Sequence, residues 1–334
     1  MTTWVPDPLL ESFACTTIEL PDAAVYAGEP AGSLCATVVR RNPPSRRRAM
    51  LYLHGWSDYF FQAHLADAMS SLGYDFYALD LRRYGRSLRP GQLAGFVTDL
   101  TAYFEEIDEA VRIISEEGHD DLVLMGHSTG GLVASLWVAD RPGEVSSLVL
   151  NSPWLELQGY PAMRPALLPM FSAVRSLSPT AALPLSDTGF YRRSISITEE
   201  GEWDYSLDLK GNKAFSIRVG WLTAIMQGHA RVASGLDIDV PVLVLISERS
   251  DFRRRWSEDL RRADVVLDVD TLSTRAPQLG RHVTLVRIDG GMHDLALSDE
   301  PARREYFAEI ERWLGAYGHS ELSTGGRPRL AAPR

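Results

Sequence analysis

The chain has 334 residues, and 45% of them are hydrophobic, which is enough for one large core or for two average domains. Its net charge of −10 excludes a general nucleic-acid binder, because neutralising phosphates requires a basic surface. Cys15 and Cys35 are too few for a disulfide framework and lack the spacing of a metal site. Residues 1–10 do not resemble a secretory signal, and no uncharged run approaches the roughly 20 residues of a membrane-spanning helix. We therefore expect a cytoplasmic protein without a transmembrane segment; its oligomeric state is not indicated.

Short apolar runs alternate with helix-like stretches along most of the chain. In the stretch 99–117, apolar residues recur at spacings of three and four, and Asp99 lies where a capping residue is expected. The apolar runs are rich in Val, Leu and Ile, which suits strands that are covered on both faces. The pattern predicts an α/β fold with a mostly parallel sheet. Strands are predicted at 49–53, 74–79, 122–125, 147–150, 242–246 and 283–288, and helices at 62–72, 99–117 and 132–139.

One stretch interrupts this alternation. Residues 152–235 are rich in proline and aromatic side chains, and they separate two predicted strands by far more than an ordinary connection. We interpret them as a cap inserted into a core formed by residues 1–151 and 236–317. The aromatic side chains of the cap favour a pocket with apolar walls. Residues 318–334 contain glycines and prolines without apolar periodicity, which predicts a disordered tail.

A short motif indicates a nucleophile. Gly126-His127-Ser128-Thr129-Gly130 lies between a predicted strand and a predicted helix. A sharp turn at this point strains the serine backbone and lifts its hydroxyl from the sheet edge, with glycines on both sides to avoid collisions. Gly318-His319-Ser320 begins in the same way but lacks the second glycine and lies in the polar tail. The strand-turn-helix setting therefore makes Ser128 the candidate nucleophile.

A serine nucleophile needs a base, and His293 is the best candidate among the eight histidines. It lies in a glycine-rich loop directly after the last predicted strand, where its side chain can project over the sheet edge. Because it follows the serine in the chain, it also fits the order serine, acid, histidine. His127 adjoins the serine but sits on the turn itself, which favours packing or exposure to solvent.

These segments resemble serine hydrolases of the α/β-hydrolase fold, in the branch that contains monoacylglycerol lipases, lysophospholipase-like esterases and serine aminopeptidases. The resemblance runs from about Ala49 to Leu314 and weakens through the cap. It implies a doubly wound, mostly parallel sheet with an inserted cap. It is carried by four segments in the right order: Leu51-Tyr52-Leu53-His54-Gly55-Trp56, Asp80-Leu81-Arg82-Arg83-Tyr84-Gly85-Arg86-Ser87, Gly126-His127-Ser128-Thr129-Gly130-Gly131, and the loop of His293.

The resemblance also implies the remaining site residues. The backbone amides of Trp56 and Thr129 correspond to the donors of the family's oxyanion hole. The catalytic acid should follow the strand 242–246, where relatives carry a short motif that this chain lacks. Asp264 is followed by three apolar residues, Val265 to Leu267, and then by Asp268. Many relatives have this spacing after the catalytic acid, and we therefore favour Asp264 over Asp251. Glu248 and Asp268 remain further candidates.

The expected activity is hydrolysis of a small carboxylic ester with an apolar acyl part, through an acyl-enzyme on Ser128 and without a metal or organic cofactor. Two alternatives remain open. An amidase or N-terminal peptidase with the same triad would recognise a substrate ammonium, for which Glu202 and Asp204 are candidates. A homologue with little turnover would instead use the pocket of the cap as a receptor for a small ligand.

Overall fold

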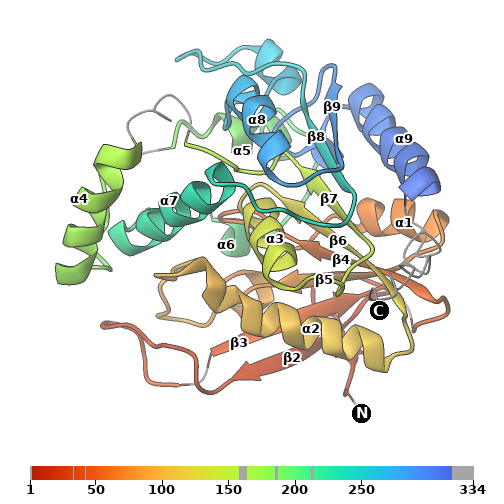
Figure 1. The fold of residues 1–334 in the computed structure, drawn as a ribbon, viewed down its shortest axis with the longest axis horizontal. Helices are drawn as coiled ribbons and strands as arrows, with labels where there is room; N and C mark the ends of the chain where they lie inside the picture. The colour runs from red at the N-terminus through yellow and green to blue at the C-terminus, as the bar shows by residue number, and fades with distance from the viewer. Residues whose placement is uncertain are drawn as a thin grey trace, which may run out of the picture.

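The computed structural model describes residues 2–32, 34–41, 43–157, 164–184, 187–211 and 214–317. A nine-stranded sheet runs through the molecule, with helices on both sides (Figure 1). The strand order is β1-β2-β3-β5-β4-β6-β7-β8-β9. The strands are β1 (Val5–Pro6), β2 (Ala14–Leu20), β3 (Leu34–Arg40), β4 (Arg48–Leu53), β5 (Asp75–Asp80), β6 (Asp121–His127), β7 (Ser147–Asn151), β8 (Val242–Ser247) and β9 (Val283–Ile288).

The six strands from β5 to β9 in this order are parallel, which confirms the mostly parallel sheet expected from the sequence. The first three strands pair antiparallel and extend one edge of the sheet. The sequence pattern predicts no strand before residue 49, so these three strands were not expected. Their local pattern carries little signal, since β3 is buried along its whole length while β1 has only two residues, both exposed.

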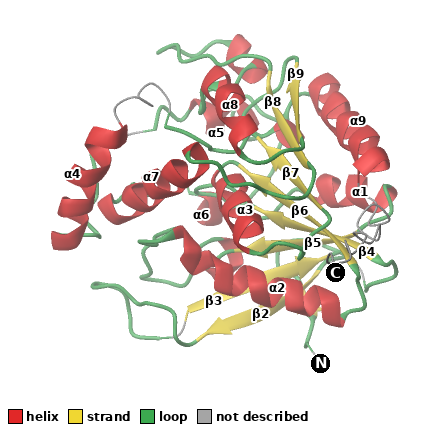
Figure 2. Ribbon diagram, viewed as in Figure 1, coloured by secondary structure: helices red, strands yellow, loops and turns green. Residues whose placement is uncertain are grey.

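Helices cover both faces of the sheet because successive residues of a strand point to opposite sides. Leu51 and Leu53 of β4 pack in the cluster that holds α2, α3 and α8, whereas Met50 and Tyr52 pack with α1 and α9. Figure 2 shows these two helical layers around the strands. The helices are α1 (Ala63–Ser71), α2 (Phe104–Glu116), α3 (Thr129–Asp140), α8 (Val269–Arg275) and α9 (Glu300–Tyr317), with short 3₁₀ turns η1 (Gly85–Ser87), η2 (Leu100–Tyr103), η4 (Glu258–Arg262), η5 (Ala276–Gln278) and η6 (Leu295–Leu297).

The predicted helix 99–117 is present but begins with the 3₁₀ turn η2 before it continues as α2. Asp99 caps this turn, since its carboxylate accepts a hydrogen bond from the Thr101 amide at 2.9 Å. The amphipathic pattern and the capping residue thus agree with the structure.

The segment between β7 and β8 carries the remaining helices of the described residues. They are α4 (Arg164–Leu177), α5 (Phe190–Ile195), α6 (Leu207–Lys210) and α7 (Val219–Ala233). In Figure 1, α4 and α7 lie together to the left of the sheet. The division into a core and a cap stays a prediction, and the predicted disordered tail 318–334 lies outside the described residues.

Candidate active site

Ser128 occupies the sharp turn between β6 and α3. Its φ of 52° and ψ of −117° are strained for a residue with a side chain, at a cost of about 1–3 kcal/mol. A Cβ atom added at Gly126 would lie 2.7 Å from the Gly130 carbonyl oxygen, and one at Gly130 would lie 2.3 Å from the His54 carbonyl oxygen. Both positions therefore require glycine, because the strand, the turn and the start of the helix touch through their backbones.

His293 lies beside the Ser128 hydroxyl. Its Nε2 atom is 3.0 Å from Ser128 Oγ, and its Nδ1 atom is 2.9 Å from Asp264 Oδ2. All three side chains are buried. When Nδ1 carries the proton and donates a hydrogen bond to the carboxylate, Nε2 is free to accept the hydrogen bond of the serine hydroxyl. The structure thus joins the predicted nucleophile, base and favoured acid in one chain of hydrogen bonds.

Backbone amides bind the carboxylate oxygen of Asp264 that does not face His293, and they hold this side chain in place. The amides of Val266 and Leu267 donate to Oδ1 at 2.8 and 2.7 Å, which leaves Oδ2 for His293. An isolated bridge pairs Asp264 with Ser250, directly after β8. Residues 252–263 therefore loop out between two points that meet in space.

The other acid candidates lie elsewhere. Asp251 forms ion pairs with Arg249 and Arg253, and the hydrogen bond from Arg253 holds the pKa of this carboxyl below its usual value. Asp268 accepts from the first amides of α8 and acts as its cap. Glu248 is exposed at the end of β8. None of the three is bonded to His293 among the described residues.

The two predicted oxyanion residues flank Ser128. Thr129 is the first residue of α3, and Trp56 follows the end of β4. A Cβ atom at Gly55 would lie 3.2 Å from Ser128 Cβ and 2.9 Å from His127 Nδ1, so the loop after β4 runs directly against the turn. The start of a helix also concentrates unpaired amides that favour negative charge.

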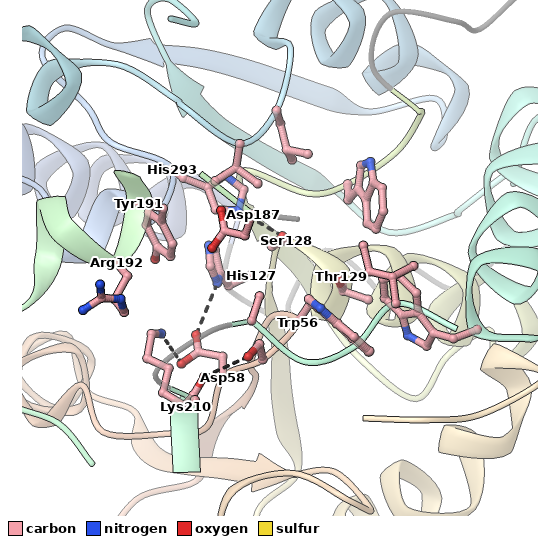
Figure 3. A pocket seen from close by; sticks show the side chains of 18 residues that line it. Trp56, Asp58, His127, Ser128, Thr129, Asp187, Tyr191, Arg192, Lys210 and His293 are labelled. Atoms are coloured by element: carbon pink, nitrogen blue, oxygen red, sulfur yellow. Dashed lines mark hydrogen bonds and ion pairs between the residues drawn. The ribbon is translucent and has the colours of Figure 1, made fainter. Parts of the chain in front are cut away.

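A pocket of about 260 Å³ opens above Ser128. In Figure 3, Trp56 and Thr129 lie to one side of the serine, and Tyr191, Arg192, Asp58 and Lys210 lie to the other. The pocket therefore has an apolar end and a polar end. The apolar end contains Trp56 and the two tryptophans that pack in series beside it, Trp221 and Trp154, and the polar end contains Asp58, Tyr191, Arg192 and Lys210.

The polar end of the pocket holds a buried ion pair that the sequence does not predict. Lys210, the last residue of α6, binds the carboxylate of Asp58, and both side chains are buried. His127 Nδ1 lies 3.9 Å from the second oxygen of that carboxylate. Burial, together with the nearby His293, holds the pKa of His127 well below its usual value, so this ring is neutral. Asp58 and Lys210 are 152 residues apart, and no local pattern indicates their contact.

The carboxylates considered for ammonium recognition do not line this pocket. Glu202 is 54% exposed and lies 3.7 Å from Arg303 and 4.0 Å from Arg261. Neither Glu202 nor Asp204 is among the lining residues.

No helix in the described ranges is long and apolar enough to cross a bilayer. Within the same ranges, no cluster of three His, Cys, Asp or Glu residues is arranged to hold a metal ion.

A serine on a sharp turn at the end of a central parallel strand, with a histidine and an aspartate from later loops beside it, is the arrangement typical of α/β hydrolases. Comparison with known proteins agrees with this class. The chain belongs to the family described as serine aminopeptidase, S33, whose model matches residues 44–300.

The chain is 29% identical over 136 residues to the monoacylglycerol lipase of Mycolicibacterium smegmatis, which covers 40% of this chain and 46% of the relative. The first curated relatives are matched over 22–55% of their length. Among solved structures, the monoacylglycerol lipase of Paleococcus ferrophilus aligns with a TM-score of 0.60 at 18% identity, over 82% of this chain and 96% of that one. A soluble variant of monoglyceride lipase from Saccharomyces cerevisiae aligns with a TM-score of 0.62 at 16% identity, over 88% and 95%. These likenesses show the fold.

Proposed function

We propose that the protein is a serine hydrolase that cleaves small carboxylic esters through an acyl-enzyme on Ser128. The observation that carries this proposal is the hydrogen-bonded chain from Ser128 through His293 to Asp264, with separations of 3.0 and 2.9 Å. This arrangement serves acyl transfer, because the histidine removes the serine proton while the aspartate fixes its tautomer. The likeness to a monoacylglycerol lipase supports an ester as the substrate.

In the proposed reaction, Ser128 Oγ forms a bond to the ester carbonyl carbon, and His293 Nε2 takes the hydroxyl proton. The amides of Trp56 and Thr129 donate to the oxyanion. When the intermediate collapses, the bond to the alcohol oxygen breaks and His293 gives its proton to the leaving alcohol. A water molecule then attacks the acyl carbon and gives its proton to His293. The bond between Ser128 Oγ and the acyl carbon breaks, His293 returns the proton to Oγ, and the carboxylic acid leaves.

The two ends of the pocket suggest how the ester lies. The three tryptophans of the apolar end suit an apolar acyl group, and the polar end suits the alcohol. We propose that residues 152–235 form the cap of this site, since Tyr191, Lys210 and Trp221 all come from this segment. Cys15 and Cys35 are both free and buried, which fits the proposed cytoplasmic location.

The polar end also favours an ester over an N-terminal peptide. Recognition of an ammonium requires an unpaired carboxylate close to the reacting atoms, but Asp58 is already neutralised by Lys210. The second carboxylate of the lining, Asp187, is exposed and accepts a hydrogen bond from the Gly189 amide. The pocket thus provides no free buried anion among its described lining residues.

A set of synthetic substrates tests the proposal. We expect turnover of p-nitrophenyl esters, little turnover of aminoacyl anilides, and labelling by a fluorophosphonate probe that is lost in Ser128→Ala. Ser320→Ala, which changes a serine outside the matched segments, is the control and should keep full labelling. Turnover of anilides without turnover of esters would assign the protein to the peptidases, and tight ligand binding without labelling would indicate a receptor.

A further inference from the structure

The loop that carries Trp56 contains a strained residue. Ser57 has a φ of 52°, in the left-handed region that a residue with a side chain rarely adopts. It is buried and lies directly after the proposed oxyanion donor. Such a conformation persists only when surrounding contacts hold it in place.

The contacts that hold Ser57 come from a segment far along the chain. The Ser57 hydroxyl donates to the Lys210 carbonyl oxygen at 2.8 Å and accepts from the Phe215 amide at 3.2 Å. One side chain thus binds two backbone groups, the carbonyl at the end of α6 and an amide further along the chain. Both bonds depend on the hydroxyl and on the left-handed backbone that aims it.

The two following residues bind the same segment. The Asp58 carboxylate pairs with the Lys210 ammonium, and the Tyr59 hydroxyl accepts from the Ser206 amide at 2.8 Å. Three consecutive side chains, at positions 57, 58 and 59, therefore bind Ser206, Lys210 and Phe215. We call this set of contacts the loop anchor.

The Trp56 amide lies between two fixed points. On one side, Gly55 packs closely against the Ser128 turn, and a Cβ atom at this position would lie 2.9 Å from His127 Nδ1. On the other side, Ser57 is held by the loop anchor. The Trp56 ring adds a third constraint, because it packs on Trp221 of α7 with ring centroids 3.7 Å apart.

We infer that Ser57 is a positioning residue for the proposed hydrolysis, through which Lys210 and Phe215 hold the Trp56 amide in the direction of the oxyanion. The inference rests on the proposed function and deepens it. When the hydroxyl is removed, the loop loses its bonds to the Lys210 carbonyl oxygen and the Phe215 amide, and the Trp56 amide is no longer held as firmly in the orientation that the transition state needs. A displacement of about 1 Å at such a donor lowers the rate by up to about a hundredfold.

The test compares Ser57→Ala and Ser57→Gly in the full chain. Glycine adopts the left-handed backbone freely but lacks the hydroxyl, so a purely structural role predicts that Ser57→Gly is stable and fully active. We expect instead that both variants lower kcat for p-nitrophenyl butyrate about ten- to a hundredfold, with little change in KM. Their affinity for a trifluoromethyl ketone, which forms an oxyanion on the serine, should fall by the same factor.

Ser12 provides the matched control. It also has a positive φ, 64°, but it is exposed in the N-terminal turn. Ser12→Ala and Ser12→Gly should keep the wild-type kcat and inhibitor affinity. If Ser57→Gly retains both of these, Ser57 does not position the donor, and the proposed hydrolysis stands without it. If the wild-type protein hydrolyses no ester and is not labelled at Ser128, the proposed function fails, and this inference fails with it.

Discussion

His293 Nδ1 lies 2.9 Å from Asp264 Oδ2, although the two residues are 29 positions apart and follow different strands. The contact exists because the chain returns to the end of β8 after residues 252–263, where Ser250 and Asp264 pair. Asp251 lies next to this bridge but points to Arg249 and Arg253. The course of the backbone thus brings Asp264 to His293 and directs Asp251 to the two arginines, although the sequence leaves both aspartates as candidates for the acid.

Replacement of the two aspartates should have very different effects. Asp264→Asn is expected to lower kcat for p-nitrophenyl butyrate by about 10³–10⁴-fold, because an amide stabilises the wrong histidine tautomer and cannot balance the imidazolium. Asp251→Asn, with a matched change in charge, should keep the wild-type kcat. Circular dichroism and the unfolding midpoint would establish that both variants fold. A large loss in Asp251→Asn alone would identify that residue as the acid.

The buried pair of Asp58 and Lys210 should show strong coupling in unfolding experiments. Lys210→Met leaves the Asp58 carboxylate buried without a partner, and we expect a loss of about 3–5 kcal/mol in the free energy of unfolding. The double variant with Asp58→Asn removes both charges and should recover much of this loss. Urea titrations of the wild type, both single variants and the double variant form a double-mutant cycle. Strictly additive losses would mean that the pair does not interact.

His127 should make the folded protein sensitive to mild acid. Burial, followed by the proximity of His293, lowers its pKa in the folded state, while the unfolded chain has an ordinary value of about 6.5. Below about pH 6.5 the unfolded state binds a proton at this histidine that the folded state does not. The free energy of unfolding is therefore unaffected by His127 above this pH and decreases as the pH falls below it. His64 and His119 also have lowered pKa values with burial as the largest cause, and they act in the same direction.

The measurement is the thermal unfolding midpoint between pH 8 and pH 5. The midpoint of the wild type should fall across this range, and that of His127→Gln should fall less steeply, with the remaining slope due in part to His64 and His119. Parallel curves for the two proteins would contradict a low pKa at His127.

Trp154 should limit the length of the acyl group. Its amide donates to the Ser128 carbonyl oxygen at 2.9 Å, and its ring lies 5.9 Å from that of Trp221 in the apolar end of the pocket. Trp154→Ala enlarges this end, so kcat/KM should fall for p-nitrophenyl butyrate and rise for the decanoate.

Trp256→Ala is the control, because Trp256 packs with Phe190 and Arg193 and is not among the pocket-lining residues. It should leave the chain-length profile unchanged. An equal loss for every ester in Trp154→Ala would show that this residue does not select the acyl group.

The parallel strands of the sheet could be predicted from the sequence alone. The strand predictions at β4 and β6 succeed because continuous apolar runs are required wherever both faces of a strand are covered. The prediction does not extend to the antiparallel edge. In β2, buried and exposed residues alternate only in the latter part of the strand, and β1 has only two residues, which is too short to show a period.

The turn at Ser128 follows from the sequence by itself. All of its parts lie within the nine residues from Leu122 to Gly130, and glycine is needed where backbones nearly touch. The tertiary structure alone decided which aspartate meets His293 and which side chains form the polar end of the pocket. Asp264 reaches the histidine only through the path of a long loop, and Asp58 meets Lys210 across 152 residues. Local backbone preferences act over a few residues, whereas such contacts depend on how whole segments pack against one another.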